Sequence, residues 1–134
     1  MVSIWYRGVL NRVTENLIPF HCLLELTYRC NLKCLHCYVV RDTQKELTTQ
    51  QFLSILDQLK ELGTLYLIIS GGEPLVRTYF FEICKHAKKN NFALRIFTNA
   101  SLINTNIAER IRELKPLVVE VGLYGFEKTH DEIT

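Results

Sequence analysis

Apolar residues recur in this chain with two different periods. Between Thr48 and Gly63 they are spaced by three and four positions, which predicts a helix with one buried face. Thr48 and Gln51 form a capping-box pattern at its start, and Gly63 suits the left-handed residue that ends a helix. Residues 65–70, Leu-Tyr-Leu-Ile-Ile-Ser, then form a continuous apolar run, which is typical of a parallel strand buried on both faces.

The alternation of helix and strand extends over most of the chain. The other expected elements are strands at 23–27, 92–97 and 117–123, and helices at 77–89 and from Asn104 or Thr105 to the residue before Pro116. This order predicts an α/β domain with a parallel sheet and right-handed crossovers. Residues 1–19 fit neither period and predict a short helix or an extended arm, so we divide the chain into an arm at 1–19 and a domain at 20–134.

Composition and charge restrict the classes of function. The chain has 134 residues, of which 48% are hydrophobic and 22% are charged, which is enough for one domain with a hydrophobic core. Its net charge is +2 with basic and acidic residues intermixed, so no basic stripe indicates a nucleic-acid partner. No apolar run approaches the roughly 20 residues that cross a bilayer, and polar residues interrupt the N-terminus where a signal peptide needs apolar ones. We therefore expect a cytoplasmic protein without a membrane or nucleic-acid partner.

Three of the five cysteines lie within one short segment, Cys-Asn-Leu-Lys-Cys-Leu-His-Cys-Tyr. Cys30, Cys34 and Cys37 can converge on one inorganic centre without long-range folding, and thiolates are ligands for soft metals. A [4Fe-4S] cluster ordinarily takes four cysteines, so three would leave one iron free to bind another molecule. The odd number and the clustering do not fit a secreted disulfide framework. We interpret Cys22 and Cys84 as small packing residues.

A zinc site is the alternative for the same segment. Tetrahedral zinc takes four ligands, commonly as two separated pairs, and Cys34 with Cys37 would form one pair. The candidate ligands for the second pair are Cys30 with His21, His36 or Cys22. Counting ligands alone leaves both metals open.

Other unusual residues directly follow the expected strands. The carboxyl ends of parallel strands meet at one edge of a sheet, where ligands commonly bind. Glycines at 71 and 72 would let backbone groups approach a ligand, and the carboxylate of Glu73 offers acceptors suited to an ammonium group. The polar connection at 38–47 is long for a turn, and we expect it to fold over the cysteine loop. The residues at this edge are Cys30, Cys34 and Cys37 after the first strand, Gly71, Gly72, Glu73 and Pro74 after the second, Thr98 and Asn99 after the third, and Tyr124 and Gly125 after the fourth.

The cysteine loop and the Gly-Gly-Glu-Pro segment resemble the two signatures of the radical S-adenosylmethionine (SAM) superfamily, in the same order along the chain. The resemblance implies that Cys30, Cys34 and Cys37 bind a [4Fe-4S] cluster and that residues 71–74 hold the amino group of S-adenosylmethionine. The amine and carboxylate of its methionine part would bind the open iron. The resemblance also implies that His36 lies beside the adenine.

Two later segments extend this resemblance. Thr98 and Asn99 resemble the Thr-Asn-Gly turn of relatives, with Ala100 in place of the glycine. The resemblance implies cofactor binding there, and a polar turn without ligand contact is the alternative. Residues 120–130 are similar to the fourth-strand segment of the SPASM-type subgroup, which modifies peptides and proteins. A serine commonly stands there at the position of Gly122, so the hydroxyl of relatives is absent from this position.

The resemblance implies an enzyme that cleaves S-adenosylmethionine reductively to a 5′-deoxyadenosyl radical. We expect its substrate to be a peptide, a protein or a cofactor precursor, and its electron donor to be a protein such as a flavodoxin or ferredoxin. The alternative is a non-catalytic truncated remnant or accessory module that binds a cluster or zinc.

The family's core is a partial TIM-type (β/α) barrel of six strand–helix units, whereas this sequence supplies about four strands. We therefore expect a parallel-sheet partial barrel truncated after about four strands. Its fourth strand would lack a following helix and have an open edge. On this expectation the chain is a fragment, a truncated product, or a chain completed by a complementing partner.

Overall fold

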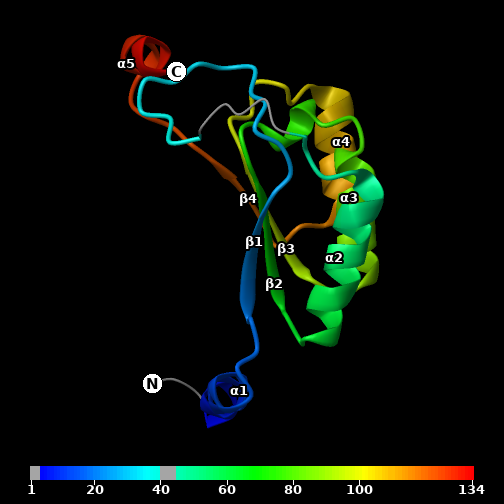
Figure 1. The fold of residues 1–134 in the computed structure, drawn as a ribbon. Coiled ribbons are helices and arrows are strands. Elements are labelled where there is room, and N and C mark those ends of the chain that lie inside the picture. Colours follow the sequence, from blue (N-terminus) through cyan, green and yellow to red (C-terminus); the bar gives the residue numbers. More distant parts are fainter. Residues whose placement is uncertain (1–3, 40–44) are drawn as a thin grey trace.

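A computed structural model describes residues 4–39 and 45–134 of the chain. Four strands form one sheet in the order β1-β2-β3-β4, and all neighbouring pairs are parallel (Figure 1). In this register Leu23 lies opposite Ile68, and Ile96 lies opposite Val119. The predicted parallel α/β architecture is therefore confirmed. The strands are β1 His21–Glu25, β2 Tyr66–Ser70, β3 Ala93–Thr98 and β4 Val118–Val121.

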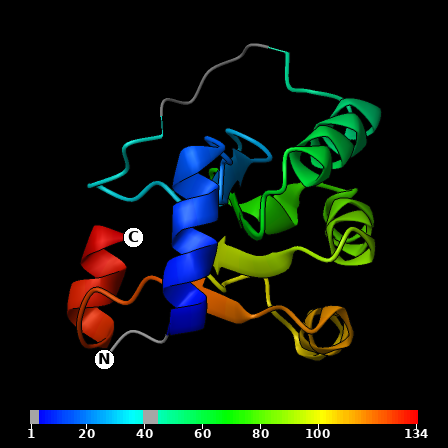
Figure 2. The same cartoon turned by 90° about the horizontal axis from the view of Figure 1, so that it is seen from below.

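Three helices connect the successive strands and lie along one face of the sheet (Figures 1 and 2). They are α2 Thr49–Glu61, α3 Phe80–Lys89 and α4 Thr105–Leu114. The hydrophobic core lies between these helices and the sheet, because alternate side chains of each strand point toward the helices. Helices outside a parallel sheet are the arrangement of a partial (β/α) barrel. Fully buried core residues include Phe52, Leu56, Leu67, Ile69, Ile83, Leu94 and Ile96.

The opposite face of the sheet is not covered by α2, α3 or α4 (Figure 1). On β3, Leu94 and Ile96 are buried in the core, whereas Arg95 and Phe97, which alternate with them, are only partly buried. Arg95 pairs with Glu120 of the neighbouring β4, with its Nε 2.9 Å from the Glu120 Oε1. A charged pair is therefore present on the open face of the sheet.

The predicted ends of α2 and the predicted cap of α4 are confirmed. The Thr48 Oγ1 accepts from the Gln51 backbone N–H at 3.3 Å, and the Gln51 Oε1 accepts from the Thr48 N–H at 2.8 Å. These two bonds complete the capping box of α2, and Gly63 after it has a positive φ of 85°. Asn104 caps α4 by accepting from the Ile107 N–H at 3.0 Å.

Several boundaries differ from the prediction. β1 begins at His21 rather than 23, because its pairing with β2 already starts there, opposite Tyr66. A 3-10 turn at Pro74–Val76 precedes α3, which begins at Phe80 rather than 77. The backbone of Arg77 is extended (ψ 120°), so the helix cannot begin at that residue.

Two terminal helices complete the described chain. α1 Ile4–Glu15 shows that residues 1–19 contain a helix, and it lies at the end of the sheet opposite the strands' carboxyl ends (Figure 1). α5 Glu127–Ile133 follows β4, so the expectation that the fourth strand lacks a following helix is wrong. None of its residues is buried, which is why no apolar periodicity marked it.

Within residues 4–39 and 45–134, every helix is too short or too polar to span a bilayer. Residues 40–44 of the connection predicted at 38–47 lie outside the described residues.

Candidate functional site

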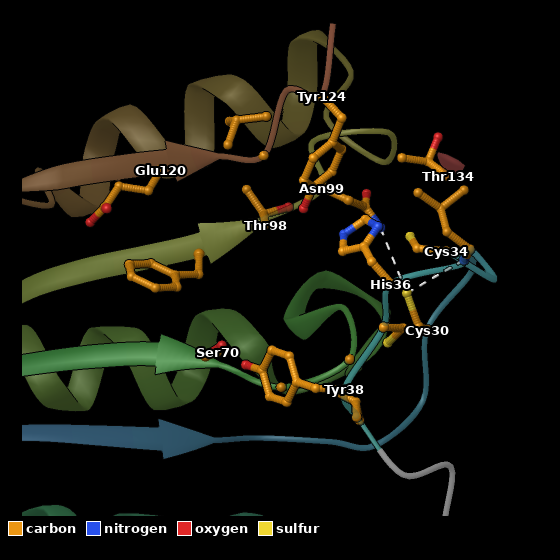
Figure 3. A pocket seen from close by; sticks show the side chains of 18 of the residues that line it. Cys30, Cys34, His36, Tyr38, Ser70, Thr98, Asn99, Glu120, Tyr124 and Thr134 are labelled. Atoms are coloured by element: carbon orange, nitrogen blue, oxygen red, sulfur yellow. Dashed lines mark hydrogen bonds between the residues drawn. The ribbon is translucent and has the colours of Figure 1, made fainter. Parts of the chain in front are cut away.

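A cavity of about 410 Å³ lies at the carboxyl ends of the strands. Cavities of roughly 300 to 1,000 Å³ are the usual size for small-molecule sites. Figure 3 shows side chains of the cysteine loop facing those of β3 and of the segment after β4. The predicted site residues that line the cavity are Cys30, Cys34, His36, Cys37, Gly71, Gly72, Thr98 and Asn99.

The cysteine loop presents three free thiols to this cavity. Cys30 and Cys34 are half-buried and Cys37 is exposed, and the Cys37 N–H donates to the Cys34 carbonyl at 3.2 Å. Among the described residues, no three His, Cys, Asp or Glu side chains are close enough together to hold one metal ion. A four-iron cluster does not need such convergence, because its thiolates bind different irons. Three thiols facing one cavity are the donors that an iron–sulfur cluster takes.

The Gly71–Gly72 turn lies directly against the segment that leads into the cysteine loop. The Gly72 N–H donates to the Thr27 carbonyl at 2.7 Å, and the Glu73 N–H donates to the Arg29 carbonyl at 2.9 Å. A Cβ at Gly71 would overlap with the Thr27 carbonyl oxygen, and one at Gly72 with that of Arg29. The glycines therefore allow two backbone segments to touch, in addition to lining the cavity.

The carboxylate of Glu73 points into the protein rather than into the cavity. Glu73 is fully buried and, among the described residues, is not part of the cavity wall. Its Oε1 accepts from the Thr98 hydroxyl at 2.9 Å and the Leu75 N–H at 3.0 Å, and its Oε2 accepts from the Asn99 N–H at 2.7 Å. Both oxygens have donors within the protein, and the direct ammonium contact expected from the sequence stays a prediction. Pro74 beside it is also buried.

Glu46, which follows the cysteine loop in the sequence, hydrogen-bonds to the segment that precedes the loop. Its carboxylate accepts from the Thr27 hydroxyl, from the Tyr28 N–H at 3.2 Å, and from the Arg29 and Arg77 guanidinium groups at 3.4 and 3.3 Å. Burial acts to raise the pKa of Glu46, but the Thr27 hydrogen bond and the Arg29 charge outweigh it and lower the pKa. Glu46 is therefore held ionised next to the segment that enters the loop.

Three aromatic rings from two distant segments meet at the cavity rim. The ring of Tyr124 lies 4.3 Å from that of His36 and 5.9 Å from that of His130, centroid to centroid. The Leu35 N–H also donates to the Ile133 carbonyl of α5 at 2.8 Å. The segment after β4 is thus joined to the cysteine loop by ring contacts and by a backbone hydrogen bond.

The absence of a side chain at Gly122 makes room for Tyr124. A Cβ on Gly122 would lie 2.8 Å from the Tyr124 hydroxyl oxygen. A phenol hydroxyl therefore occupies the space next to Gly122.

Sequence reasoning missed several residues that line the cavity or support it. Phe97 and Glu120 reach the cavity from the open face of the sheet. Side chains alternate between the two faces of a strand, so Phe97, the neighbour of buried Thr98, could have been assigned to the open face. Asn31 and Ser101 hydrogen-bond to each other at 2.7 Å between the cysteine loop and the β3–α4 connection. No local pattern marks such a pair, because both are ordinary polar loop residues.

The part of the chain that forms the cavity also matches known proteins. Residues 24–134 match the radical SAM superfamily. The Fe-coproporphyrin III synthase of Methanosarcina barkeri is 34% identical over 111 residues, covering 81% of this chain and 28% of the relative. The mycofactocin maturase MftC of Mycobacterium ulcerans is 36% identical over 103 residues, covering 75% of this chain and 28% of the relative.

A solved structure has the same fold over nearly the whole chain. SuiB of Streptococcus suis, bound to the precursor peptide SuiA, superposes with a TM-score of 0.77 at 23% identity, covering 96% of this chain and 30% of SuiB. This chain therefore spans less than a third of the length of these three proteins. With the cysteine loop, the glycine turn and the parallel partial barrel all in place, the chain belongs to the radical SAM superfamily.

Proposed function

We propose that this chain forms the cluster- and cofactor-binding part of a radical SAM enzyme that modifies a peptide, a protein or a cofactor precursor. The observation that carries the proposal is the single cavity shared by the three cysteines, the Gly71–Gly72 turn and the end of β3. The substrate class is supported by the names of the relatives, a maturase and a porphyrin-forming synthase, and by the peptide bound to SuiB.

Cys30, Cys34 and Cys37 would hold a [4Fe-4S] cluster through their thiolates, and three ligands would leave one iron for the amine and carboxylate of S-adenosylmethionine. When bound, the cluster supplies the electron for reductive cleavage of the cofactor's sulfonium. Because Cys37 is the exposed cysteine, a protein donor such as a flavodoxin or ferredoxin approaches from its side of the loop.

The remaining cavity residues orient the cofactor. Backbone carbonyls of the Gly71–Gly72 turn accept from its ammonium group, a role that the buried Glu73 carboxylate leaves to them. The His36 ring would lie beside the adenine, and Tyr124 packs against that ring from the side of β4. Glu73 and Pro74 act indirectly, by holding the turn and the end of β3 in position.

The substrate approaches over the open face of the sheet. Phe97 and Glu120 connect this face with the cavity. A group bound there reaches the reacting atoms without crossing the packed core.

Anaerobic reconstitution with iron and sulfide tests the proposal. We expect the 134-residue chain to bind a cluster, visible in its absorbance and in its electron paramagnetic resonance spectrum after reduction, and to form 5′-deoxyadenosine from S-adenosylmethionine. A cluster without 5′-deoxyadenosine would favour the non-catalytic alternative, and stoichiometric zinc in place of iron would refute the cluster assignment.

Single serine substitutions identify the ligands. Cys30→Ser, Cys34→Ser and Cys37→Ser should each abolish the cluster, whereas Cys22→Ala and Cys84→Ala should keep the full iron and sulfide content. The triple serine variant must contain no cluster iron, since retention of the full complement would show that other residues bind it.

A further inference from the structure

The side-chain amide of Asn99 bridges the end of β3 and the cysteine loop. Its Nδ2 lies 3.8 Å from the Sγ of Cys30 and 3.1 Å from the Oδ1 of Asn31. Hydrogen bonds to sulfur are longer than those to oxygen because the sulfur atom is larger. Both N–H groups of the amide therefore have an acceptor, and one of them is a proposed cluster ligand (Figure 3).

The orientation of this amide is determined by its oxygen. The Asn99 Oδ1 accepts from the Ser101 backbone N–H at 3.0 Å, and it lies 2.7 Å from the Ser101 hydroxyl. The reversed amide would place its NH₂ group against the Ser101 N–H and its oxygen against the Cys30 sulfur, which would lose these bonds. The hydrogen bonds within the turn therefore orient the Asn99 NH₂ group toward the Cys30 sulfur.

The backbone of Asn99 is held from the opposite side. Its N–H donates to the Glu73 Oε2 at 2.7 Å, and Glu73 is fully buried. A buried carboxylate with all its oxygens hydrogen-bonded has little freedom to move. Asn99 is thus fixed at both its backbone and its side chain.

Cys30 differs from the other two cysteines of the loop in its hydrogen bonds. Its Sγ accepts from the Leu32 backbone N–H at 3.4 Å as well as from Asn99. Between described residues, no hydrogen bond reaches the Sγ of Cys34 or Cys37. One of the three ligand sulfurs therefore receives two N–H donors, and the longer-range one comes from Asn99.

We infer that Asn99 tunes the reduction potential of the cluster by donating a hydrogen bond to the thiolate of Cys30. The inference rests on the proposed function. Reduction adds one electron to the cluster, and the positive end of an N–H dipole stabilises the added negative charge. Removing the donor should make the midpoint potential more negative, since partners of metal ligands tune the metal centre.

The test is a spectroelectrochemical titration of reconstituted variants, with low-potential mediators carrying the electron from the electrode. Asn99→Ala should lower the midpoint potential, and Asn99→Asp should lower it further because a carboxylate replaces the donor. Ser101→Ala is the matched control: it removes a hydroxyl from the same network but keeps the backbone N–H that orients Asn99, so its potential should match the wild type. Resonance Raman spectra should show a shift of the Fe–S(Cys) bands in both Asn99 variants and no shift in Ser101→Ala.

Different failures are distinguishable. If the wild-type chain binds no cluster, the proposed function and this inference both fail. If the clusters form and the Asn99 variants keep the wild-type potential, only the inference is overturned. Loss of the cluster in both Asn99 variants, with full retention in Ser101→Ala, would also overturn it, since Asn99 would then hold the ligand loop rather than tune the cluster.

Discussion

The helix-covered core and the rim at the carboxyl ends of the strands are built by different forces. In the core, Leu67, Leu94 and Ile96 have no exposed surface and are held by burial, which has no preferred direction. At the rim, Glu73 and Asn99 are held by hydrogen bonds of fixed geometry to named atoms. The two regions meet on β3, whose helix-facing side chains belong to the core up to Ile96 and to the rim from Thr98 onward.

This difference shows which changes each region tolerates. A core position accepts another apolar side chain of similar volume at a cost below about 1.5 kcal/mol. At the rim, even a methyl group on Gly71 or Gly72 would overlap with backbone atoms of the segment before the cysteine loop. Stability therefore depends mainly on the amount of buried surface, whereas the position of the thiols depends on individual contacts.

The largest effect on folding is expected in the core. Leu94→Ala removes a fully buried side chain and should lower the free energy of unfolding by about 2 to 5 kcal/mol, measured by urea denaturation. The control Leu117→Ala changes a side chain that is 61% exposed, and it should stay within about 0.5 kcal/mol of the wild type. The Leu94 variant should still bind a full cluster per folded chain, and a selective loss of iron would contradict the separation of the two regions.

An intermediate effect is expected for Glu73 at the rim. Glu73→Gln keeps the shape but replaces an acceptor with an NH₂ group facing donors, so the apo chain should lose about 1 to 3 kcal/mol of stability. Its affinity for S-adenosylmethionine in calorimetry should fall as well, through displacement of Thr98 and Asn99. The exposed Glu82→Gln is the control. Weaker cofactor binding with unchanged apo stability would instead support a direct ammonium contact.

The smallest effect at neutral pH concerns the buried thiol of the core. Burial raises the pKa of Cys84 from 9.0 to about 12. Because the pKa of Cys84 is higher in the folded than in the unfolded chain, its contribution to the free energy of unfolding is fully present below pH 9 and is lost as the pH rises toward 12.

The burial of Cys84 can be tested by thiol labelling. In native chains at about pH 8, iodoacetamide should modify Cys37 and leave Cys84 unmodified, as peptide mass spectrometry would show. Equal labelling of both would contradict the assigned burial.

The elements and the approximate site were predictable because their signals are local. The capping box at Thr48 and the apolar run of β2 are readable within a few residues, and the rim follows from the rule that parallel strands end at one edge. The direction of the Glu73 side chain was not predictable, since it depends on donors at Thr98 and Asn99, on the next strand. α5 was missed for a related reason: no residue of it is buried, so its sequence carries no apolar period.

The hydrogen bonds of the cysteine loop also imply an order of events during synthesis. Asn31 bonds to Ser101 across 70 residues, and Asn99 bonds to Cys30 across 69. A nascent chain exposes its three thiols long before β3 has left the ribosome, so the loop lacks these partners while it is being made. We expect metal delivery to be productive only after β3 has docked, and the thiols to be most vulnerable to oxidation in that interval.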